Sequence, residues 1–263
     1  MSREEPVLFE IRDNVAHITL NRPHAGNSID LGMAKELMAV ALECERDKRV
    51  RAVLLRGAGN DFCFGGDVKI FAAQAELESY LREVTLYLHL AVSRFARLNA
   101  PVIAAVQGAA AGGGFSLAIS CDLVSAADSA TFLMAYTKIG MAPDGGSSYF
   151  LPRLVGLKRA MELTLTNRVL SAREACEWGL VTEVVAADKL TERAEELARS
   201  LAQGPTGAFG AAKRLLHSGW NQSLETQMEW ESRAIAGAGG TSDGKEGIRA
   251  FVEKRKAKFS GSF

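Results

Sequence analysis

The feature that most constrains the fold is a run of small residues near the middle of the chain, where an apolar segment meets three consecutive glycines. Residues 101–106 are short, apolar and partly β-branched, which is typical of a strand buried in a parallel sheet. Gly112, Gly113 and Gly114 follow, and a helix is predicted from Phe115. Glycines at a strand-to-helix junction allow close backbone approach and leave helix-start N–H groups available to an anion or oxyanion. The alternative is a tight turn whose glycines serve only helix packing.

A second glycine-bearing loop, residues 61–68, has the same setting. It follows a predicted strand at 50–56 and precedes a helical segment that runs from Val68 to Leu98. Loops at the ends of successive parallel strands meet at one edge of the sheet, so we expect the two loops to lie together. Each then offers a backbone N–H to one oxygen. Neither loop has the GxGxxG or Walker pattern of nucleotide-phosphate sites.

Length, charge and cysteine usage restrict the class of protein. A chain of 263 residues with 48% hydrophobic content can bury one large α/β core, or a core with a small appendage. Its 31 basic and 31 acidic residues cancel, so no overall field favours nucleic acid or an anionic membrane. The four cysteines have no paired spacing, and neither a signal-peptide core nor a membrane-length apolar run is present. We therefore expect a cytoplasmic protein with reduced thiols and no nucleic-acid or membrane partner.

The remaining pattern alternates strands with helices and becomes helical towards the C-terminus. Further strands are expected at 7–11 and 15–20, as an antiparallel hairpin, and at 121–126, 130–134 and 179–185. Further helices are expected after a cap at Asp30, at 159–167, after a capping box at Ser171, and at 190–202, 206–218, 224–236 and 243–259. Residues 236–240, rich in glycine, are predicted to be a flexible joint.

One acidic residue, Asp144, stands between a proline and two glycines. Its simplest interpretation is a cap on a helix that starts near Gly145.

Four motifs, taken in order, resemble the crotonase (enoyl-CoA hydratase/isomerase) superfamily. They are Phe62–Asp67, Gly108–Gly114, Pro143–Gly146 and Glu177–Val181, and the similarity runs from about residue 7 to Phe259. The resemblance implies an α/β fold with a β-β-α spiral core over residues 1–200, which carries the acyl-CoA site. It also implies a C-terminal helical region over 201–263 that forms homotrimers, usually paired into hexamers.

The resemblance further implies an acyl-CoA thioester substrate whose carbonyl oxygen is held by the backbone N–H groups of Gly66 and Gly113. A preorganised donor of this kind is commonly worth about 3–4 kcal/mol in the transition state. No separate cofactor is expected, because coenzyme A is part of the substrate, and no metal is expected. The residues predicted to contact the substrate are Ala25, Phe64, Asp67, Val68, Ser116, Met141 and Lys258.

The reaction depends on which side chains move protons. The hydratases of this family carry two glutamates that position a water, whereas Ser116 and Tyr136 stand at those places here. Asp144 matches the acid that isomerase members place after the proline, where a single carboxylate shuttles a proton between two carbons. We therefore predict an acyl-CoA isomerase that shifts a double bond or rearranges a ring through an enolate, similar to the single-aspartate isomerases that include the ring-epoxide phenylacetyl-CoA type.

Other functions remain open. The chain also resembles the 4-chlorobenzoyl-CoA dehalogenases, in which the acid at Asp144 is a nucleophile and a histidine at His89 assists it. It departs from them at Tyr136, where they have tryptophan, and at Pro143, where they have asparagine. Hydration with a water held by Ser116, Tyr136 or Asp144 is a third chemistry.

A non-catalytic acyl-CoA or RNA-binding protein is the fourth alternative. The zero net charge and the lack of a basic patch with interleaved aromatic residues argue against RNA. A basic cluster on the predicted last helix is either a solvated face or part of a coenzyme A phosphate site; it comprises Lys254, Arg255, Lys256 and Lys258.

Overall fold

Two β-sheets organise residues 5–261, the part of the chain that the computed structural model describes. Residues 1–4 and 262–263 lie outside the described part of the chain. They are the first residues of the predicted core region 1–200 and the last residues of the predicted C-terminal region 201–263. The larger sheet has the strand order β1-β2-β3-β4-β6-β9, and each neighbouring pair is parallel except β1 and β2. These strands are β1 Val7–Arg12, β2 Val15–Leu20, β3 Ala52–Gly57, β4 Val102–Val106, β6 Leu123–Ala127 and β9 Glu183–Val185.

The smaller sheet has the order β5-β7-β8. Its strands are β5 Ala109–Ala111, β7 Thr131–Leu133 and β8 Leu170–Ser171. The chain leaves β4, runs into β5 through Gly108 at φ +55°, and then starts α4. Strand β5 was not predicted, because a strand of alanines has no alternation of apolar and polar residues. The order of two strands followed by a helix recurs along the chain. This arrangement is the predicted α/β spiral core.

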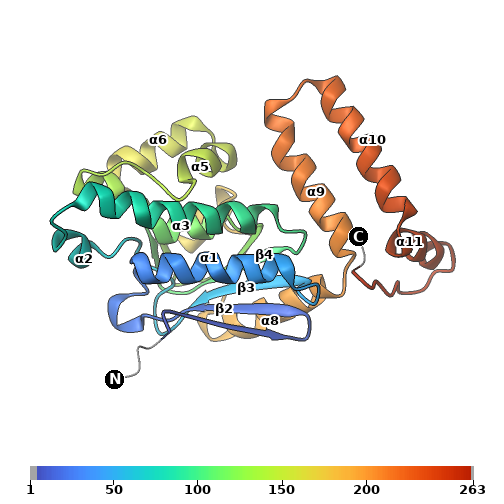
Figure 1. Cartoon of the computed structure of the whole chain (residues 1–263), viewed down its shortest axis with the longest axis horizontal. Helices are drawn as coiled ribbons and strands as arrows, with labels where there is room; N and C mark the ends of the chain where they lie inside the picture. The colour runs from blue at the N-terminus through green and yellow to red at the C-terminus, as the bar shows by residue number, and fades with distance from the viewer. Residues whose placement is uncertain (1–4, 262–263) are drawn as a thin grey trace.

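Helices cover both faces of the larger sheet. In Figure 1, α1 and α3 run side by side over one face and α8 lies against the opposite face, in agreement with the contacts of α8 with β3, β4 and β6. The helices are α1 Leu31–Arg46, α2 Val68–Ala72, α3 Leu77–Arg97, α4 Gly113–Ile119, α5 Ser147–Val155, α6 Leu157–Thr166, α7 Ala172–Glu177, α8 Leu190–Ala202, α9 Thr206–Ser218, α10 Leu224–Gly240 and α11 Ser242–Val252.

Local capping explains where several of these helices begin. The Asp30 carboxylate accepts a hydrogen bond from the N–H of Met33 at 2.8 Å, so the predicted cap of α1 is confirmed. The predicted capping box at Ser171 and Glu174 starts α7 and is also confirmed. The helix predicted from Val68 to Leu98 is interrupted, because α2 ends at Ala72 and α3 begins only at Leu77.

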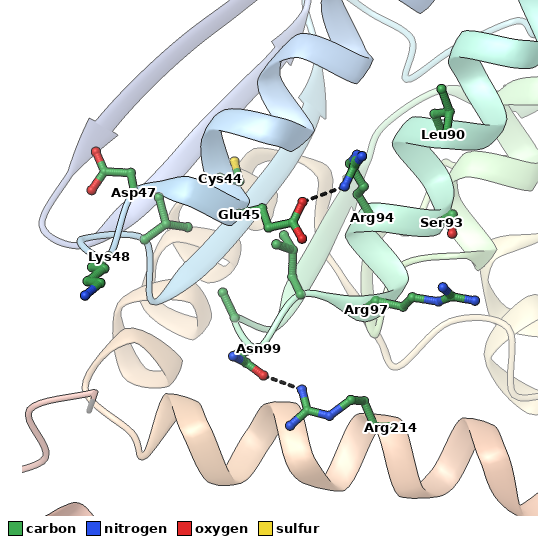
Figure 2. Close-up of a pocket in the computed structure, with 13 residues that line it drawn as sticks. Cys44, Glu45, Asp47, Lys48, Leu90, Ser93, Arg94, Arg97, Asn99 and Arg214 are labelled. Atoms are coloured by element: carbon green, nitrogen blue, oxygen red, sulfur yellow. Dashed lines mark hydrogen bonds and ion pairs between the residues drawn. The ribbon is translucent and has the colours of Figure 1, made fainter. Parts of the chain in front are cut away.

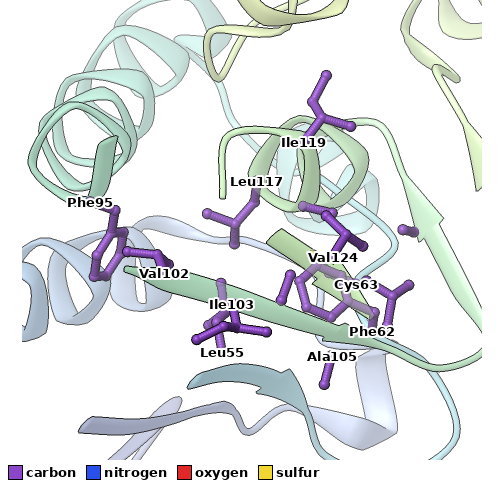
Figure 3. Packing of buried hydrophobic residues seen from close by; sticks show 14 of the residues in the cluster. Leu55, Phe62, Cys63, Phe95, Val102, Ile103, Ala105, Leu117, Ile119 and Val124 are labelled. Atoms are coloured by element: carbon purple, nitrogen blue, oxygen red, sulfur yellow. The ribbon is translucent and has the colours of Figure 1, made fainter. Parts of the chain in front are cut away.

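The core lies between the larger sheet and α1, α3 and α4. Its largest side chains with almost no exposed surface include Phe62, Phe95 and Phe115. Figure 3 shows Phe62 gathered with Ile103 of β4 and Leu117 of α4, so the helix that follows the triple glycine is anchored to the sheet by apolar packing. This packing fixes the first turn of α4 rigidly over the edge of the sheet.

Two predictions for the C-terminal region are wrong. Residues 236–240 are not a joint, since α10 continues through Gly240 and packs on α9 and α11. Tertiary packing overrides the low helix propensity of glycine there. The last helix ends at Val252 rather than residue 259, because Lys254 has φ +55° and the chain turns back to place Arg255 on Glu246. The basic cluster therefore follows α11 instead of lying on it.

Candidate active site

The two glycine loops touch each other at the edge of the sheet, as predicted. The N–H of Cys63 donates to the carbonyl of Ala109 at 3.1 Å, and the N–H of Ala111 donates to the carbonyl of Cys63 at 2.9 Å. At Gly65, φ is +88° and an added Cβ would lie 2.6 Å from the Ala111 oxygen and 2.8 Å from the Gly113 nitrogen. Only glycine allows this approach, so the loop sequence itself holds the two chain segments together.

The backbone N–H groups of Gly66 and Gly113 are the donors that this junction leaves available. Ile29 forms hydrogen bonds with both neighbours of Gly66. The N–H of Ile29 donates to the Gly65 carbonyl at 2.7 Å, and the N–H of Asp67 donates to the Ile29 carbonyl at 3.0 Å. In such a parallel bridge the N–H of Gly66 points away from Ile29. Gly113 is the first residue of α4 and has no intrahelical acceptor. Neither N–H has an acceptor among the described residues, and both glycines line one cavity of about 360 Å³.

This cavity, named the oxyanion cavity below, has mostly apolar walls. The segment before α1, the 61–68 loop, α2, α3 and the segment after β7 supply their side chains. They are Ile29, Phe64, Val68, Phe71, Leu81, Val84, Leu88, Ala135, Ile139, Met141 and Ala142. Thr85, Tyr136, Lys138 and Asp144 supply the polar side chains, and Asp144 is the carboxylate among the residues that line it. An apolar cavity with a few convergent polar groups is the usual form of a small-molecule site.

A short hydrogen-bonded chain fixes the carboxylate of Asp144. The Tyr136 hydroxyl donates to Asp144 Oδ1 at 2.5 Å, and Ser116 Oγ lies 2.8 Å from the same hydroxyl. Because the one phenolic proton goes to the carboxylate, Ser116 is the donor in its contact with Tyr136. Burial and the negative charge of Asp144 raise the pKa of Tyr136, so the phenol keeps its proton at neutral pH. One oxygen of Asp144 is thus held in place and the other stays available.

The alternative in which Asp144 caps a helix near Gly145 is wrong. Helix α5 begins at Ser147 after Gly146, and no side chain caps it. The backbone carbonyl of Asp144 accepts from the N–H of Ser147 at 3.1 Å and from its hydroxyl at 2.9 Å, which closes the turn. The side chain is therefore left to face Tyr136.

Ser116 does not reach the oxyanion cavity. It is completely buried on α4, where its hydroxyl also approaches the Gly112 carbonyl at 3.2 Å, and Tyr136 stands between it and Asp144. The structure thus places this predicted substrate-binding residue behind the cavity wall, where it supports Tyr136.

His89 lies beside Asp144 but not in the oxyanion cavity. Its Nε2 accepts a hydrogen bond from the N–H of Gly145 at 3.2 Å, which requires the neutral ring to carry its proton on Nδ1. His89 and Asp144 both line a separate, larger cleft on the other side of residues 143–146. The histidine therefore stabilises the loop of Asp144 from the side of the larger cleft.

The other predicted contact residues divide into two groups. Phe64, Val68 and Met141 line the oxyanion cavity, whereas Ala25, Asp67 and Lys258 do not. Asp67 caps α2 by accepting from the N–H of Ile70 at 3.2 Å and pairs with Arg22 at 2.8 Å.

Ala25 ends the 3-10 helix Pro23–Ala25, and the carbonyl of the next residue, Gly26, accepts from the N–H of Phe64 at 2.9 Å. Lys258 is exposed beyond α11, where its N–H donates to Glu246. Both lie apart from the cavity wall.

Sequence reasoning missed part of the wall. Leu81, Val84, Thr85 and Leu88 come from one face of α3, and their helical spacing could have identified the face but not its partner. Lys138 gave no signal in the sequence, and neither did Ala135, which has φ +60°. Among the described residues no cluster of three His, Cys, Asp or Glu side chains could hold a metal ion. Within the same range no helix is both long and apolar enough to cross a membrane.

Comparison with known proteins agrees with this geometry. The family model for enoyl-CoA hydratase/isomerase matches residues 10–262. The chain belongs to the enoyl-CoA hydratase/isomerase family. It is accordingly an enzyme of the crotonase type, with the mostly parallel sheet and the C-terminal helices of that fold.

Relatives with different reactions align over nearly the whole chain. A 1,2-epoxyphenylacetyl-CoA isomerase from Escherichia coli (strain K12) is 39% identical over 259 residues, 98% of this chain and 99% of the relative. A 4-chlorobenzoyl coenzyme A dehalogenase-2 from Arthrobacter sp is 37% identical over 250 residues, 94% of this chain and 91% of the relative. The crystal structure of an enoyl-CoA hydratase from Bacillus anthracis superposes with a TM-score of 0.91 at 35% identity, covering 98% of this chain and 100% of that one.

Proposed function

We propose that this enzyme isomerises an acyl-CoA thioester, by a double-bond shift or a ring rearrangement, with Asp144 as the single acid/base. The observation that carries the proposal is the Ser116–Tyr136–Asp144 chain, which presents one carboxylate to the cavity that Gly66 and Gly113 line. A family member with a closely related sequence is named as an isomerase of 1,2-epoxyphenylacetyl-CoA.

The proposed mechanism uses the backbone donors and the carboxylate in sequence. The N–H groups of Gly66 and Gly113 hold the thioester oxygen, which stabilises the negative charge that develops when a proton leaves the α-carbon. The free oxygen of Asp144 takes this proton and returns it at another carbon of the acyl group. No water is consumed and no group leaves, so the product has the composition of the substrate.

The absence of a second carboxylate in the wall of the oxyanion cavity argues against hydration. Among the described residues that line it, Asp144 is the one acidic side chain, and the buried Ser116 hydroxyl cannot act as a general base of comparable strength. Asp144 with Tyr136 therefore supports transfer of a proton better than addition of water.

A dehalogenase-like hydrolysis is the second candidate. It is favoured by the position of His89, whose Nε2 lies 3.2 Å from the nitrogen of Gly145, directly after the aspartate. In that reaction the carboxylate of Asp144 attacks an aromatic ring carbon and displaces chloride, and water then cleaves the aryl ester. The hydrogen bond from Gly145 also occupies Nε2 of His89, so this nitrogen is not available to activate the water. This second consequence favours the isomerase.

A panel of thioesters separates the candidates. Purified enzyme is incubated in heavy water with a 3-enoyl-CoA, a 2-enoyl-CoA, 1,2-epoxyphenylacetyl-CoA and 4-chlorobenzoyl-CoA, and the products are separated by liquid chromatography and measured by mass spectrometry. We expect an isomeric product that elutes apart from the 3-enoyl or epoxide substrate. Release of chloride would support hydrolysis instead, and a mass gain of one water from the 2-enoyl substrate would support hydration.

We further propose a homotrimer, or a dimer of trimers, formed through the C-terminal helical region of residues 201–263. Large apolar side chains on α9 and α11 support this, since Leu216 is 75% and Phe251 86% exposed. Sedimentation velocity on the full chain measures the assembly. A cytoplasmic location, a spiral core over residues 1–200 and the lack of any cofactor beyond substrate coenzyme A remain parts of this proposal.

A further inference from the structure

Arg22 follows β2 by two residues, and its side chain is largely buried, with 15% of its surface exposed. Asn27 holds its backbone on both sides. The N–H of Arg22 donates to Asn27 Oδ1 at 2.9 Å, and the N–H of Asn27 donates to the Arg22 carbonyl at 2.9 Å. Asn27 is completely buried, and its Nδ2 donates to the carbonyls of Ala58 and Asp61, both at 2.8 Å. The backbone of Arg22 is thus fixed to the segment that follows β3.

The guanidinium group of Arg22 joins two chain segments. Its Nη2 donates to Asp67 Oδ2 at 2.8 Å. Its Nη1 donates to the carbonyl of Ser28 at 2.5 Å and lies 3.3 Å from Asp30 Oδ2. The other oxygen of Asp67 caps α2 by accepting from the N–H of Ile70 at 3.2 Å. Because the guanidinium is a rigid planar fork, these contacts fix both the distance and the orientation between the two segments.

These two segments are the ones that orient the N–H of Gly66. Arg22 contacts both chain neighbours of Ile29 and the residue that directly follows Gly66. Ile29 and Gly66 form the parallel bridge that leaves the Gly66 N–H pointing away from Ile29. Arg22 therefore holds both sides of this bridge, although it is not among the residues that line the oxyanion cavity.

The position of the bridge also affects the second donor. Ile29 is almost completely buried, and a Cβ added to Gly113 would lie 3.4 Å from Ile29 Cδ1. The side chain of Ile29 thus packs beside the residue that carries the second N–H. The spacing of the Gly66 and Gly113 donors accordingly depends on where the bridge is held.

The charge of Arg22 balances two carboxylates. Asp67 is buried and Asp30 is partly buried, and among the residues that the structure describes no other cation lies within ion-pair distance of either one. Removing the guanidinium leaves these carboxylates without a cationic partner in a poorly solvated place, which favours separation of the segments that carry them.

We propose that Arg22 is a positioning residue for the reaction. It holds the Ile29–Gly66 bridge in the geometry in which the Gly66 N–H meets the thioester oxygen. The inference rests on the proposed use of the Gly66 and Gly113 N–H groups as donors to that oxygen. Because such donors act through their placement at the developing charge, losing this support weakens the polarisation of the carbonyl and lowers the rate.

Infrared difference spectroscopy of a bound thioester tests the proposal without requiring turnover. Octanoyl-CoA, isotope-labelled at the carbonyl carbon, is bound to the wild type and to the Arg22→Met and Arg22→Lys variants. Methionine removes the charge, whereas lysine keeps it as a single point that cannot span both segments. A carbonyl that accepts strong hydrogen bonds absorbs at lower wavenumber, so we expect a shift of the carbonyl band in the wild type and a smaller shift in both variants.

Steady-state kinetics with the isomerised thioester form the second readout. We expect kcat to fall about 10- to 100-fold in both Arg22 variants and KM to change less than about threefold, because the walls that bind the acyl group stay in place.

Arg94→Met is the matched control. Figure 2 shows Arg94 of α3 paired with Glu45 of α1, at 2.6 Å. This pair also joins two elements, but it lies at a different pocket, which contains neither Gly66 nor Gly113. We expect Arg94→Met to keep the wild-type carbonyl shift and kcat.

The possible results separate the proposals. A wild-type carbonyl shift and kcat in either folded Arg22 variant would overturn the role of Arg22, and so would equal losses in Arg94→Met. Circular dichroism confirms folding, and Arg22→Lys keeps the charge balance if Arg22→Met does not fold. Absence of a carbonyl shift in the wild type would refute the donors themselves and the role of Arg22 with them, whereas a shift that survives in the variants refutes Arg22 alone.

Discussion

At the scale of single residues, Tyr136 is the side chain whose contacts the structure defines most sharply. Its hydroxyl donates to Asp144 Oδ1 at 2.5 Å and contacts Ser116 Oγ at 2.8 Å. Removing it in Tyr136→Phe eliminates a hydrogen bond to a charged group, which is worth about 1.5–3 kcal/mol. We therefore expect kcat to fall about 10- to 100-fold in steady-state assays, with little change in binding of a saturated acyl-CoA.

Ser116→Ala is the matched control for this prediction. Ser116 contacts the phenol and the Gly112 carbonyl but not the carboxylate, so we expect a smaller loss of kcat. A larger loss in Ser116→Ala than in Tyr136→Phe would contradict the role of Tyr136 as the residue that positions Asp144.

At the scale of elements, the first turn of α4 carries the N–H of Gly113, which we propose as a donor to the thioester oxygen. Proline is well tolerated at the first position of a helix, so Gly113→Pro removes the N–H with little disturbance of α4. Gly113→Ala keeps the N–H, and its Cβ would make ordinary contacts, 3.4 Å from Ile29 Cδ1 and 3.6 Å from Gly65 Cα. We expect kcat to fall about 10²- to 10³-fold in the proline variant and far less in the alanine variant. Equal activity of the two variants would show that Gly113 is not a donor.

The elements also show how far the sequence alone leads. Apolar runs and capping residues predicted most strands and helices, and the two glycine loops were predicted to meet because parallel strands share an edge. The sequence could not reveal that Asp144 faces Tyr136 instead of capping α5, since this depends on a turn closed by the Asp144 carbonyl. It also could not place Ser116 behind Tyr136 or reveal the wall from α3, because both depend on tertiary packing.

At the scale of the whole molecule, a buried histidine couples the stability of the fold to pH. His17 of β2 is 4% exposed, and its Nδ1 lies 3.4 Å from Glu195 Oε1 of α8, on the face of the sheet away from α1. Burial lowers the pKa of His17 in spite of the opposing effect of Glu195. The folded state thus binds the proton less readily than the unfolded state.

This pKa shift fixes the direction of the pH dependence. The contribution of His17 to stability is fully present above the unfolded pKa of about 6.5 and is lost as the pH falls below it, by at most about 1.4 kcal/mol per pH unit. Urea unfolding at pH 7.5 and 5.5 measures this loss, and we expect a smaller pH dependence in His17→Gln than in the wild type. The same or a steeper dependence in the variant would exclude His17 as its origin.

The central claim is that Asp144 alone carries the proton between two carbons of an enolate held by Gly66 and Gly113. Asp144→Asn tests it most directly, because asparagine keeps the size of the side chain and cannot take up the proton. We predict that the variant binds the thioester as the wild type does, loses turnover at least about 10³-fold and no longer exchanges the substrate α-proton with deuterium in heavy water. Retained isomerisation or α-proton exchange in Asp144→Asn would contradict the claim.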